Sequence, residues 1–356
     1  QRGDSLSDIP AKHSAIDAVY TVRAGKFRRY HKAGWRQLLD TWTLLKNIRD
    51  FFYVFIGTFQ SWRLLRKLNA DVVFIRGGFV GVPVGLAAAR CRVPYITHDS
   101  DAVPSLANRM ISKKAAAHAV AMPKETYAYP QDKTFQVGVP VDSTYQPVTP
   151  RLKNDYRQQL GINIEASVLL VTGGGLGAQR LNDAVVSIVP VLFEQYPGLV
   201  LLHLTGRMHE KPIKAHYGHL LGVGQQKQVI VKGFVEDLYR YSGAADVIIC
   251  RAGATNLAEF AVQHKACIVV PNPQLTGGHQ IRNSELLQKT GAVTLVNEEE
   301  IAADPQSLLT AIKDLLDSSS KRNALEEGLA AYARPDSAKV LAKLIIEVAN
   351  RGGKPS

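Results

Sequence analysis

At 356 residues, the chain is longer than one ordinary domain, and its length predicts about two. A content of 46% hydrophobic and 21% charged residues is typical of a globular protein and excludes a disordered or collagen-like chain. Residues 1–150 hold 21 Lys and Arg against 11 Asp and Glu, whereas the remainder holds 22 against 20. Such a basic first half is typical of a domain that faces an anionic surface, either a membrane or a nucleic acid.

The cysteines and the hydropathy pattern indicate the cellular compartment. Cys91, Cys250 and Cys267 are odd in number and lack the spacing of a metal site, which is typical of a reducing cytosol. Neither a secretory signal nor an apolar run of the ~20 residues that span a bilayer is visible. We therefore expect a cytoplasmic protein.

The first part of the chain predicts a long helix and then a parallel sheet. Residues 36–68 have a helical period and carry an aromatic stripe, which fits burial in a core or, because basic residues flank it, a place at a membrane interface. The stretch 70–101 predicts strand, glycine-rich turn, helix and strand, and two short strands follow within 115–122 and 135–141. The stripe comprises Trp42, Phe51, Phe52, Phe55, Phe59 and Trp62.

The second part repeats the alternation of strands and helices. Residues 140–162 contain three prolines and end in a charged helix, which predicts a linker at 142–163. Between 164 and 335, strands are expected at 167–172, 199–204, 228–231, 246–250, 266–271 and 292–296. The pattern predicts an α/β fold of two doubly wound parallel-sheet (Rossmann-like) domains, 1–141 and 164–335, facing each other across a cleft. A last helix at 336–350 is expected to pack back on the first domain.

The stretch "VTGGGLGAQRLN" places a glycine turn between a strand and a helix. Gly173-x-Gly175-x-x-Ala178 satisfies the dinucleotide fingerprint, which also needs an acidic residue at the tip of the next strand. That strand ends in Thr205-Gly206, so we do not expect a nicotinamide cofactor. The turn is interpreted as a site for another anion.

A second anion site is predicted at "DVIICRAGATNLAEF". The small residues before the helix leave the backbone amides of Ala254, Thr255 and Asn256 free to bind a diphosphate. Glu259, one turn further on, is placed to accept hydrogen bonds from ribose hydroxyls, although a Glu there also stabilises a helix by itself. Downstream, His279, Gln280 and Asn283 are suited to sugar hydroxyls or to capping a helix.

Together these stretches resemble the MurG-type glycosyltransferases, the N-acetylglucosaminyltransferases of peptidoglycan synthesis. In the second half the matching motifs are "GGGLGAQRLN", "GFVEDLYRYSGAADVIICRAGATNLAEFAV" and "HQIRNSELL". In the first half they are "RGGFVGVPVGLAAA", "VPYITHDSDAVPSLANRMIS" and "VGVPVD". The resemblance runs from about residue 8 to residue 348 and implies the GT-B fold.

The resemblance also implies a reaction and a donor site. GlcNAc passes from UDP-GlcNAc to the C4 hydroxyl of MurNAc on an undecaprenyl-diphosphate lipid (lipid I to lipid II), with inversion and with neither a metal nor another cofactor. Glu259 would bind the ribose, residues 254–256 the diphosphate, Phe234 and Val235 the uracil, and His279 and Gln280 the sugar. The nucleotide-sugar site then comprises Gly174, Gly175, Gly177, Phe234, Val235, Ala254, Thr255, Asn256, Glu259, His279 and Gln280.

In the first domain, the resemblance implies an acceptor site after the strand "VPYIT". His98, Asp99 and Asp101 fall where the family keeps His-Glu-x-Asn. The attacking hydroxyl must lose its proton, and we predict Asp99 as the acceptor of that proton, with His98 beside it and Asp101 next in line. The alternative is that the two aspartates cap the following turn. Asn108, Gly77 and Gly78 are the predicted acceptor-binding residues.

The chain departs from the family in four places. Gly175 replaces the usual serine of the glycine turn, and Asp99 is one methylene shorter than the usual Glu. Asp101 replaces an Asn and creates Asp99-x-Asp101, which we interpret as a coincidental likeness to the D-x-D metal motif of other glycosyltransferases. The family's first strand and its Gly-x-Gly-Gly-His turn have no counterpart, so we expect the first domain to be incomplete at its N-terminus.

Three other functions stay open from the sequence. They are a UDP-GlcNAc 2-epimerase-like enzyme, a glycosyltransferase for a different lipid acceptor, and a UDP-sugar-binding protein without activity. The expected partners are UDP-GlcNAc, the undecaprenyl-diphosphate-linked MurNAc-peptide and an anionic membrane surface, with no nucleic acid. These partners place the protein peripherally on the inner face of the plasma membrane.

Overall fold

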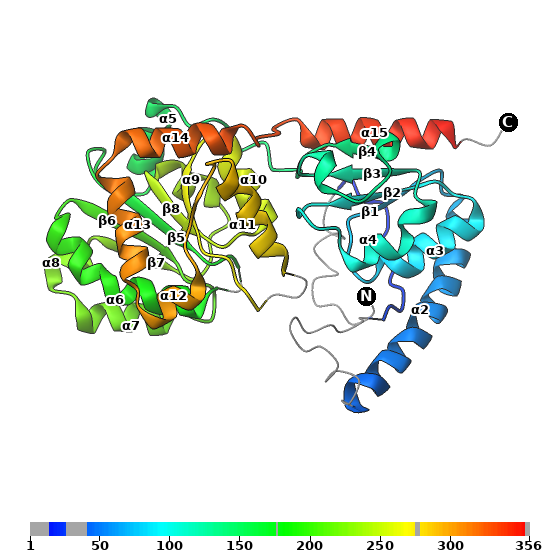
Figure 1. The fold of residues 1–356 in the computed structure, drawn as a ribbon, viewed down its shortest axis with the longest axis horizontal. Helices are drawn as coiled ribbons and strands as arrows, with labels where there is room; N and C mark the ends of the chain where they lie inside the picture. Colours follow the sequence, from blue (N-terminus) through cyan, green and yellow to red (C-terminus); the bar gives the residue numbers. More distant parts are fainter. Residues whose placement is uncertain (1–13, 26–40, 176, 275–277, 353–356) are drawn as a thin grey trace. The chain divides into compact units, whose positions relative to one another are not determined.

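The computed structural model describes residues 14–25, 41–175, 177–274 and 278–352, with side chains from residue 47 onward in the first helix (Figure 1). The chain divides into two compact units. Unit 1 is Gln1–Gly138 with Ser337–Ser356, and unit 2 is Val139–Asp336. Each unit has its own parallel sheet, so the predicted α/β class is confirmed.

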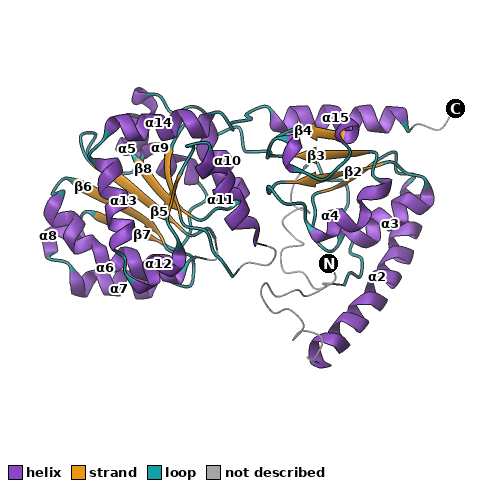
Figure 2. Ribbon diagram, viewed as in Figure 1, coloured by secondary structure: helices purple, strands orange, loops and turns teal. Residues whose placement is uncertain are grey.

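Unit 1 contains a four-stranded parallel sheet in the order β1-β2-β3-β4 (Figure 2). Leu341, Leu344 and Val348 of the last helix pack on Ile96 and Ala117 on one face of the sheet. Because alternate residues of a strand point to opposite faces, the other face has a core of its own, in which Ile75 and Tyr95 pack with Ala88 and Ile111 of the helices on that side. The strands are β1 (Val73–Ile75), β2 (Tyr95–Asp99), β3 (Ala117–Val120) and β4 (Thr134–Gln136). The helices are α2 (Thr41–Leu68), α3 (Gly81–Cys91), α4 (Leu106–Ile111) and α15 (Ser337–Arg351), with 3-10 turns at Ser112–Lys114, Lys124–Thr126 and Gln131–Lys133.

Unit 2 contains a six-stranded parallel sheet in the order β10-β9-β8-β5-β6-β7. Alternate residues of the central strand enter two separate cores: Leu169 and Val171 in one, Val168 and Leu170 in the other. The strands are β5 (Ser167–Thr172), β6 (Leu199–Leu204), β7 (Val229–Lys232), β8 (Val247–Cys250), β9 (Ala266–Val269) and β10 (Thr294–Leu295). The helices are α5 (Pro150–Gln159), α6 (Gln179–Gln195), α7 (Glu210–Leu220), α8 (Val223–Gln226), α9 (Leu238–Ala244), α10 (Ala254–Val262), α11 (His279–Lys289), α12 (Glu298–Ala303), α13 (Gln306–Leu316) and α14 (Ser319–Ala330).

The aromatic stripe of α2 is largely exposed. Phe51, Phe52, Phe55 and Phe59 are 63%, 60%, 74% and 54% exposed, so core burial does not explain them. Trp62 is half-buried, and the side chain of Trp42 lies outside the described residues. Helix α2 packs on the rest of the unit through other residues, such as Val54, which contacts Val82 of α3. Core burial of the four phenylalanines is therefore wrong, and the interfacial interpretation stays a prediction.

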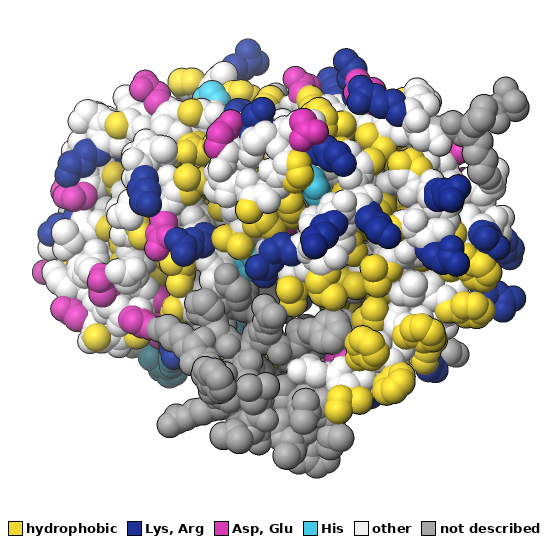
Figure 3. Space-filling view, turned by 45° about the vertical axis from the view of Figure 1, so that its right-hand side comes forward, with side chains coloured by type: hydrophobic (Ala, Val, Ile, Leu, Met, Phe, Trp, Pro, Cys, Tyr) yellow, Lys and Arg dark blue, Asp and Glu magenta, His cyan; other side chains and the backbone are white. Residues whose placement is uncertain are grey.

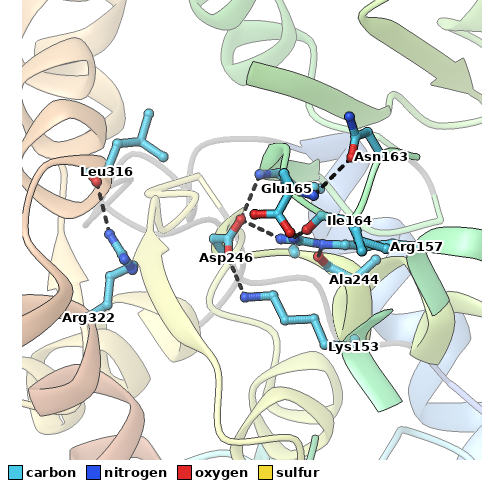
Figure 4. A network of polar contacts seen from close by, with 12 residues as sticks. Lys153, Arg157, Asn163, Ile164, Glu165, Ala244, Asp246, Leu316 and Arg322 are labelled. Carbon is cyan, nitrogen blue, oxygen red and sulfur yellow. Dashed lines mark hydrogen bonds and ion pairs between the residues drawn. The ribbon is translucent and has the colours of Figure 1, made fainter. Parts of the chain in front are cut away.

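Helix α5, at the end of the segment predicted as a linker, is bonded to the unit 2 sheet through one carboxylate (Figure 4). Asp246, just before β8, forms ion pairs with Lys153 and with Arg157 (2.7 Å), and it accepts a hydrogen bond from the Val168 amide (2.7 Å). Arg157 also donates to the carbonyl oxygens of Ala244 (3.1 Å) and Ile164 (2.5 Å). Burial by itself would raise the pKa of Asp246, but the two cations outweigh it and the pKa lies below its usual value.

Replacing this carboxylate destabilises unit 2. We expect Asp246→Asn to lower the free energy of unfolding by about 3 kcal/mol at pH 7, because Lys153 and Arg157 lose their partner in a half-buried site. Asp237→Asn is the matched control, since its pair with Arg240 is exposed. Urea unfolding of the full chain measures both.

The pH dependence gives a second check. The pKa of Asp246 is depressed in the folded protein, so its contribution is present above the unfolded pKa and is lost as the pH falls through the folded pKa. The difference between wild type and Asp246→Asn should therefore shrink below about pH 4. A difference that stays constant down to pH 2.5 contradicts this account.

Candidate functional site

The glycine turn after β5 packs directly on the end of β6. Gly174 and Gly177 have φ angles of +82° and +79°, in the left-handed region that glycine adopts readily. A Cβ atom on Gly177 would lie 2.3 Å from the carbonyl oxygen of Thr205, so only glycine fits there. Helix α6 follows, and its N-cap residue Ala178 makes no capping bond. Its first amides are therefore available to an anion.

A buried chain of polar bonds fixes this turn. The Asn182 side chain of α6 donates from Nδ2 to the Thr205 carbonyl oxygen (3.0 Å), and its Oδ1 accepts a hydrogen bond from His203 Nε2 (3.1 Å). His203 Nδ1 lies 2.8 Å from the Tyr217 hydroxyl. Burial lowers the pKa of His203 to about 3, so the ring is neutral. Sequence analysis missed these residues; the signal was a polar Asn182 within the apolar face of α6, since buried polar groups are paired.

The loop before α10 is held by three bonds. Arg251 donates to the Val270 carbonyl oxygen (3.0 Å) and forms a buried ion pair with Glu298. Asn283 of α11 donates to the Ala252 carbonyl oxygen (3.1 Å). Gly253, the N-cap residue of α10, makes no capping bond. The amides of residues 254–256 lie in the first turn, where the helix supplies no acceptor.

Glu259 lies in the second turn of α10 and is half-buried. Burial raises the pKa of Glu259 to about 7, the neighbouring Tyr145 hydroxyl opposes that rise, and the nearby Asp142 adds to it. This carboxyl group therefore changes its charge near neutral pH.

Among the remaining residues that are predicted to bind the nucleotide sugar, some side chains are exposed and others pack or form hydrogen bonds within the protein. Phe234 is 44% exposed, and the guanidinium of Arg207 lies 3.9 Å from the centre of its ring. Val235 packs against the core below it. Gln280 accepts a hydrogen bond from the Asn272 amide (2.8 Å), which holds its side chain against the preceding loop. His279 begins α11 and is half-buried.

The residues of unit 2 that are predicted to bind the nucleotide sugar lie at one edge of its sheet. All its strands are parallel, so the loops after β5, β7, β8 and β9 meet at the carboxyl edge. The pairing of Thr172 with Cys250 sets the glycine turn beside the loop before α10. A Cβ atom on Gly175 would lie 3.9 Å from the Phe234 ring. The individual roles of these residues stay predictions.

In unit 1, Asp99 ends β2 and is only 4% exposed. One carboxylate oxygen accepts hydrogen bonds from the Ser105 amide and the Asn108 side chain (both 2.9 Å), and the other accepts one from the Tyr129 hydroxyl (2.8 Å). Burial raises the pKa of Asp99, and these bonds oppose the rise. Both oxygens are thus engaged by protein donors, an arrangement that fixes the turn after β2 and does not suit a cation.

The neighbours of Asp99 differ in their exposure. His98 is fully buried, with Nε2 2.9 Å from the Gly138 carbonyl oxygen, and burial lowers its pKa. Asp101 is half-buried, and its carbonyl oxygen accepts a bond from the Tyr127 hydroxyl (2.8 Å). Of the three predicted catalytic side chains, Asp101 is therefore the most accessible. The catalytic assignment stays a prediction.

Asn108 and the two predicted glycines lie close to this turn. Gly77 and Gly78 have φ angles of +82° and +79°. A Cβ atom on Gly77 would lie 3.1 Å from Ser105 Oγ and 3.7 Å from the Asn108 amide nitrogen. Asn108 is fully buried, and its Oδ1 accepts no hydrogen bond from the residues that the structure describes. Within those same residues, no group of three His, Cys, Asp or Glu side chains could hold a metal ion.

Comparison with known proteins identifies relatives of both units. The glycosyltransferase family 28 N-terminal domain matches residues 29–120, and the family 28 C-terminal domain matches residues 168–341. A UDP-N-acetylglucosamine–N-acetylmuramyl-(pentapeptide) pyrophosphoryl-undecaprenol N-acetylglucosamine transferase from Halalkalibacterium halodurans is 30% identical over 91% of this chain and 85% of its own length. The transferase of the same name from Geobacter sulfurreducens is 32% identical over 83% and 77%.

Solved structures agree with this relationship. MurG from Acinetobacter baumannii has a TM-score of 0.66 at 26% identity and covers 83% of this chain and 79% of its own. A UDP-GlcNAc 2-epimerase from Neisseria meningitidis, bound to UDP-GlcNAc, has a TM-score of 0.62 at 14% identity over 96% and 95%, a likeness of fold alone. The chain belongs to glycosyltransferase family 28 and is a MurG-family glycosyltransferase with the GT-B fold.

Proposed function

We propose that this chain transfers N-acetylglucosamine from UDP-GlcNAc to the C4 hydroxyl of MurNAc on an undecaprenyl-diphosphate-linked muropeptide, with inversion at the anomeric carbon. The observation that carries this proposal is the match over 91% of the chain to a transferase named for this reaction. The cluster at the carboxyl edge of unit 2 supports the donor half. The polar cluster after β2 and the exposed surface of α2 support the proposed binding of the lipid-linked acceptor.

The donor nucleotide binds at the carboxyl edge of the unit 2 sheet. The first amides of α10 bind the diphosphate, because they lack acceptors and lie at the positive end of the helix dipole. Glu259 accepts hydrogen bonds from the ribose, and Phe234 and Val235 flank the uracil. Gly174, Gly175 and Gly177 bring backbone close to the phosphates, while His279 and Gln280 bind the sugar.

The reaction is a single displacement. The MurNAc oxygen forms a bond to C1 of the sugar as the bond from C1 to the UDP oxygen breaks, and the hydroxyl proton passes to a base. Charge that develops on the departing UDP is stabilised by the amides at the starts of α6 and α10, which are fixed before the reaction. We assign the base to the turn after β2, with Asp101 preferred to Asp99 because Asp101 is half-buried whereas Asp99 is only 4% exposed.

The donor assignment predicts that Glu259 matters for UDP binding. We expect Glu259→Ala to weaken UDP binding by about 1–3 kcal/mol, or roughly 5- to 150-fold, because the ribose hydroxyls lose their acceptor. Glu236→Ala, at an exposed position before α9, is the control and should bind UDP like wild type. Calorimetry on the full chain measures both variants. Unchanged binding in Glu259→Ala removes Glu259 from the site.

The assignment of the base predicts that substitutions of Asp101 and of Asp99 have different effects. Asp101→Asn should lower kcat by roughly 10²–10⁴ with little change in the KM for UDP-GlcNAc. Asp99→Asn should lower the melting temperature as well, because an amide cannot accept all three of its hydrogen bonds. Turnover assays with UDP-GlcNAc and the lipid-linked acceptor, together with thermal unfolding, measure both effects. Full turnover in both variants excludes this turn as the source of the base.

The exposed part of α2 supplies a surface for the membrane that carries the acceptor (Figure 3). Phe55, Phe59 and Trp62 of α2 and Leu86 of α3 line a hollow of about 390 Å³ that Arg66 and Arg90 border. The Arg66 guanidinium lies 4.4 Å from the Trp62 ring centre. Within the described residues, no helix is long and apolar enough to cross a bilayer. We propose that this aromatic–basic surface binds anionic lipid peripherally, on the inner face of the plasma membrane.

Binding to vesicles should depend on both components of this surface. We expect the double substitution Phe55→Ser, Phe59→Ser to weaken binding to phosphatidylglycerol-containing vesicles at least tenfold, because it removes exposed apolar area. Arg66→Gln with Arg90→Gln should weaken it several-fold at low salt and less at high salt. Val340→Ser on α15, exposed on the opposite face of the unit 1 sheet, is the control. Sedimentation with vesicles measures these effects; binding that ignores lipid charge and salt contradicts the proposal.

A further inference from the structure

The segment between β3 and β4 brings two tyrosines to the turn after β2. Tyr127 follows the 3-10 turn Lys124–Thr126 with extended backbone angles (φ −105°, ψ 139°). In an extended chain, residues two apart point to the same side, and the order buried, exposed, buried of Tyr127, Ala128 and Tyr129 agrees with this. The two tyrosine rings are parallel within 2°, with centres 6.3 Å apart. The segment therefore places two buried hydroxyl groups on one side.

The Tyr127 hydroxyl links the end of β3 to the turn after β2. It accepts a hydrogen bond from the Met122 amide (3.2 Å), just past β3, and donates one to the carbonyl oxygen of Asp101 (2.8 Å). The pairing of β2 with β3 ends where Asp99 lies opposite Val120, two residues before Asp101. The hydroxyl thus holds the backbone of Asp101 beyond the end of the strand pairing.

Tyr129 holds the same turn through Asp99. Its hydroxyl donates to Asp99 Oδ2 (2.8 Å), and its ring stacks on His118 of β3, with ring centres 3.9 Å apart and planes within 6°. His118 Nδ1 in turn lies 2.7 Å from the Thr97 hydroxyl of β2. A ring packed in this way against a side chain of the sheet has little room to move. Asp99 and Asp101 are therefore both held by one short segment.

The direction of the Asp101 side chain depends on the bond from Tyr127. The carbonyl group and the Cβ atom of Asp101 are attached to the same Cα atom, so a fixed carbonyl group limits the directions that the carboxylate can take. A general base must lie within about 2.6–3.2 Å of the hydroxyl that it deprotonates. A misplacement of ~1 Å can lower a rate by about 10²-fold. A base on a turn therefore requires a restraint on the backbone of that turn.

We propose that Tyr127 is a positioning residue for the transfer reaction: by fixing the Asp101 carbonyl group, its hydroxyl holds the Asp101 carboxylate where this accepts the proton of the attacking hydroxyl. Tyr129 supports the same turn by holding Asp99. The inference rests on the proposed function, in which Asp101 is the base. The geometry of the base then depends on a residue 26 positions further along the chain.

The test is a double-mutant cycle for turnover of UDP-GlcNAc and the lipid-linked acceptor by the full chain. Tyr127→Phe removes the hydroxyl and keeps the buried ring. It should lower kcat roughly 10- to 100-fold and leave the KM for UDP-GlcNAc within about twofold of wild type, because the predicted donor residues lie in unit 2. In the Asp101→Asn background, the same substitution should lower kcat by no more than about twofold, since the carboxylate that it positions is absent.

Tyr95→Phe is the matched control. Tyr95 is similarly buried in unit 1, but it begins β2, whereas Asp99 ends it, and its hydroxyl donates to the Ile111 carbonyl oxygen (2.5 Å). Tyr95→Phe and Tyr127→Phe each remove a buried hydrogen bond to a backbone carbonyl group, so both should lower the melting temperature by a similar amount. Only Tyr127→Phe should lower kcat.

The outcomes separate the role of Tyr127 from the assignment of the base. The role of Tyr127 is overturned by unchanged kcat in Tyr127→Phe, by an equal loss of kcat in Tyr95→Phe, or by the full loss recurring in the Asp101→Asn background. Full turnover in Asp101→Asn alone instead overturns Asp101 as the base.

Discussion

Parallel pairing in the unit 2 sheet is the constraint on which the donor site depends. Strands that run the same way end at the same edge, so the loops after β5, β7, β8 and β9 meet there although they lie up to about 100 residues apart in the chain. The register of β5 with β8, Thr172 opposite Cys250, brings two helix starts together. Two positive helix ends at one edge suit the diphosphate of the proposed donor before any side chain is considered.

Buried polar bonds then make these loops rigid. Arg251 and Glu298 fix the loop before α10, and Asn182 with His203 fixes the glycine turn on the end of β6. Buried ion pairs add little net stability to a fold, but they hold the backbone around them in one arrangement. Amides that are already aligned need no reorganisation when charge develops on the departing UDP, which is how such sites accelerate group transfer.

The sequence predicted the fold class, because it follows from local patterns: apolar strands that alternate with helices. The glycine turn and the uncapped helix starts lie where the sequence places them, and the donor site assigned to them stays a prediction. The sequence did not predict the burial of Asp99, which depends on Tyr129 thirty residues later. It left the aromatic stripe of α2 undecided, because helical period shows which residues share a face and does not show what covers that face. These features are set by tertiary contacts that a single sequence does not display.

Two of the four glycines of the turn after β5, Gly177 and Gly175, differ in what a side chain would meet. At Gly177 a side chain would collide with the Thr205 carbonyl oxygen, so the backbone packing dictates the residue. At Gly175, where the family usually has serine, a Cβ atom would meet only the Phe234 ring, at an ordinary contact distance of 3.9 Å. The space would thus admit a serine, and the glycine gives up a hydroxyl contact that the fold permits. In the donor site that we propose, the diphosphate therefore depends more heavily on backbone amides, and on the residues that hold the start of α10 in place.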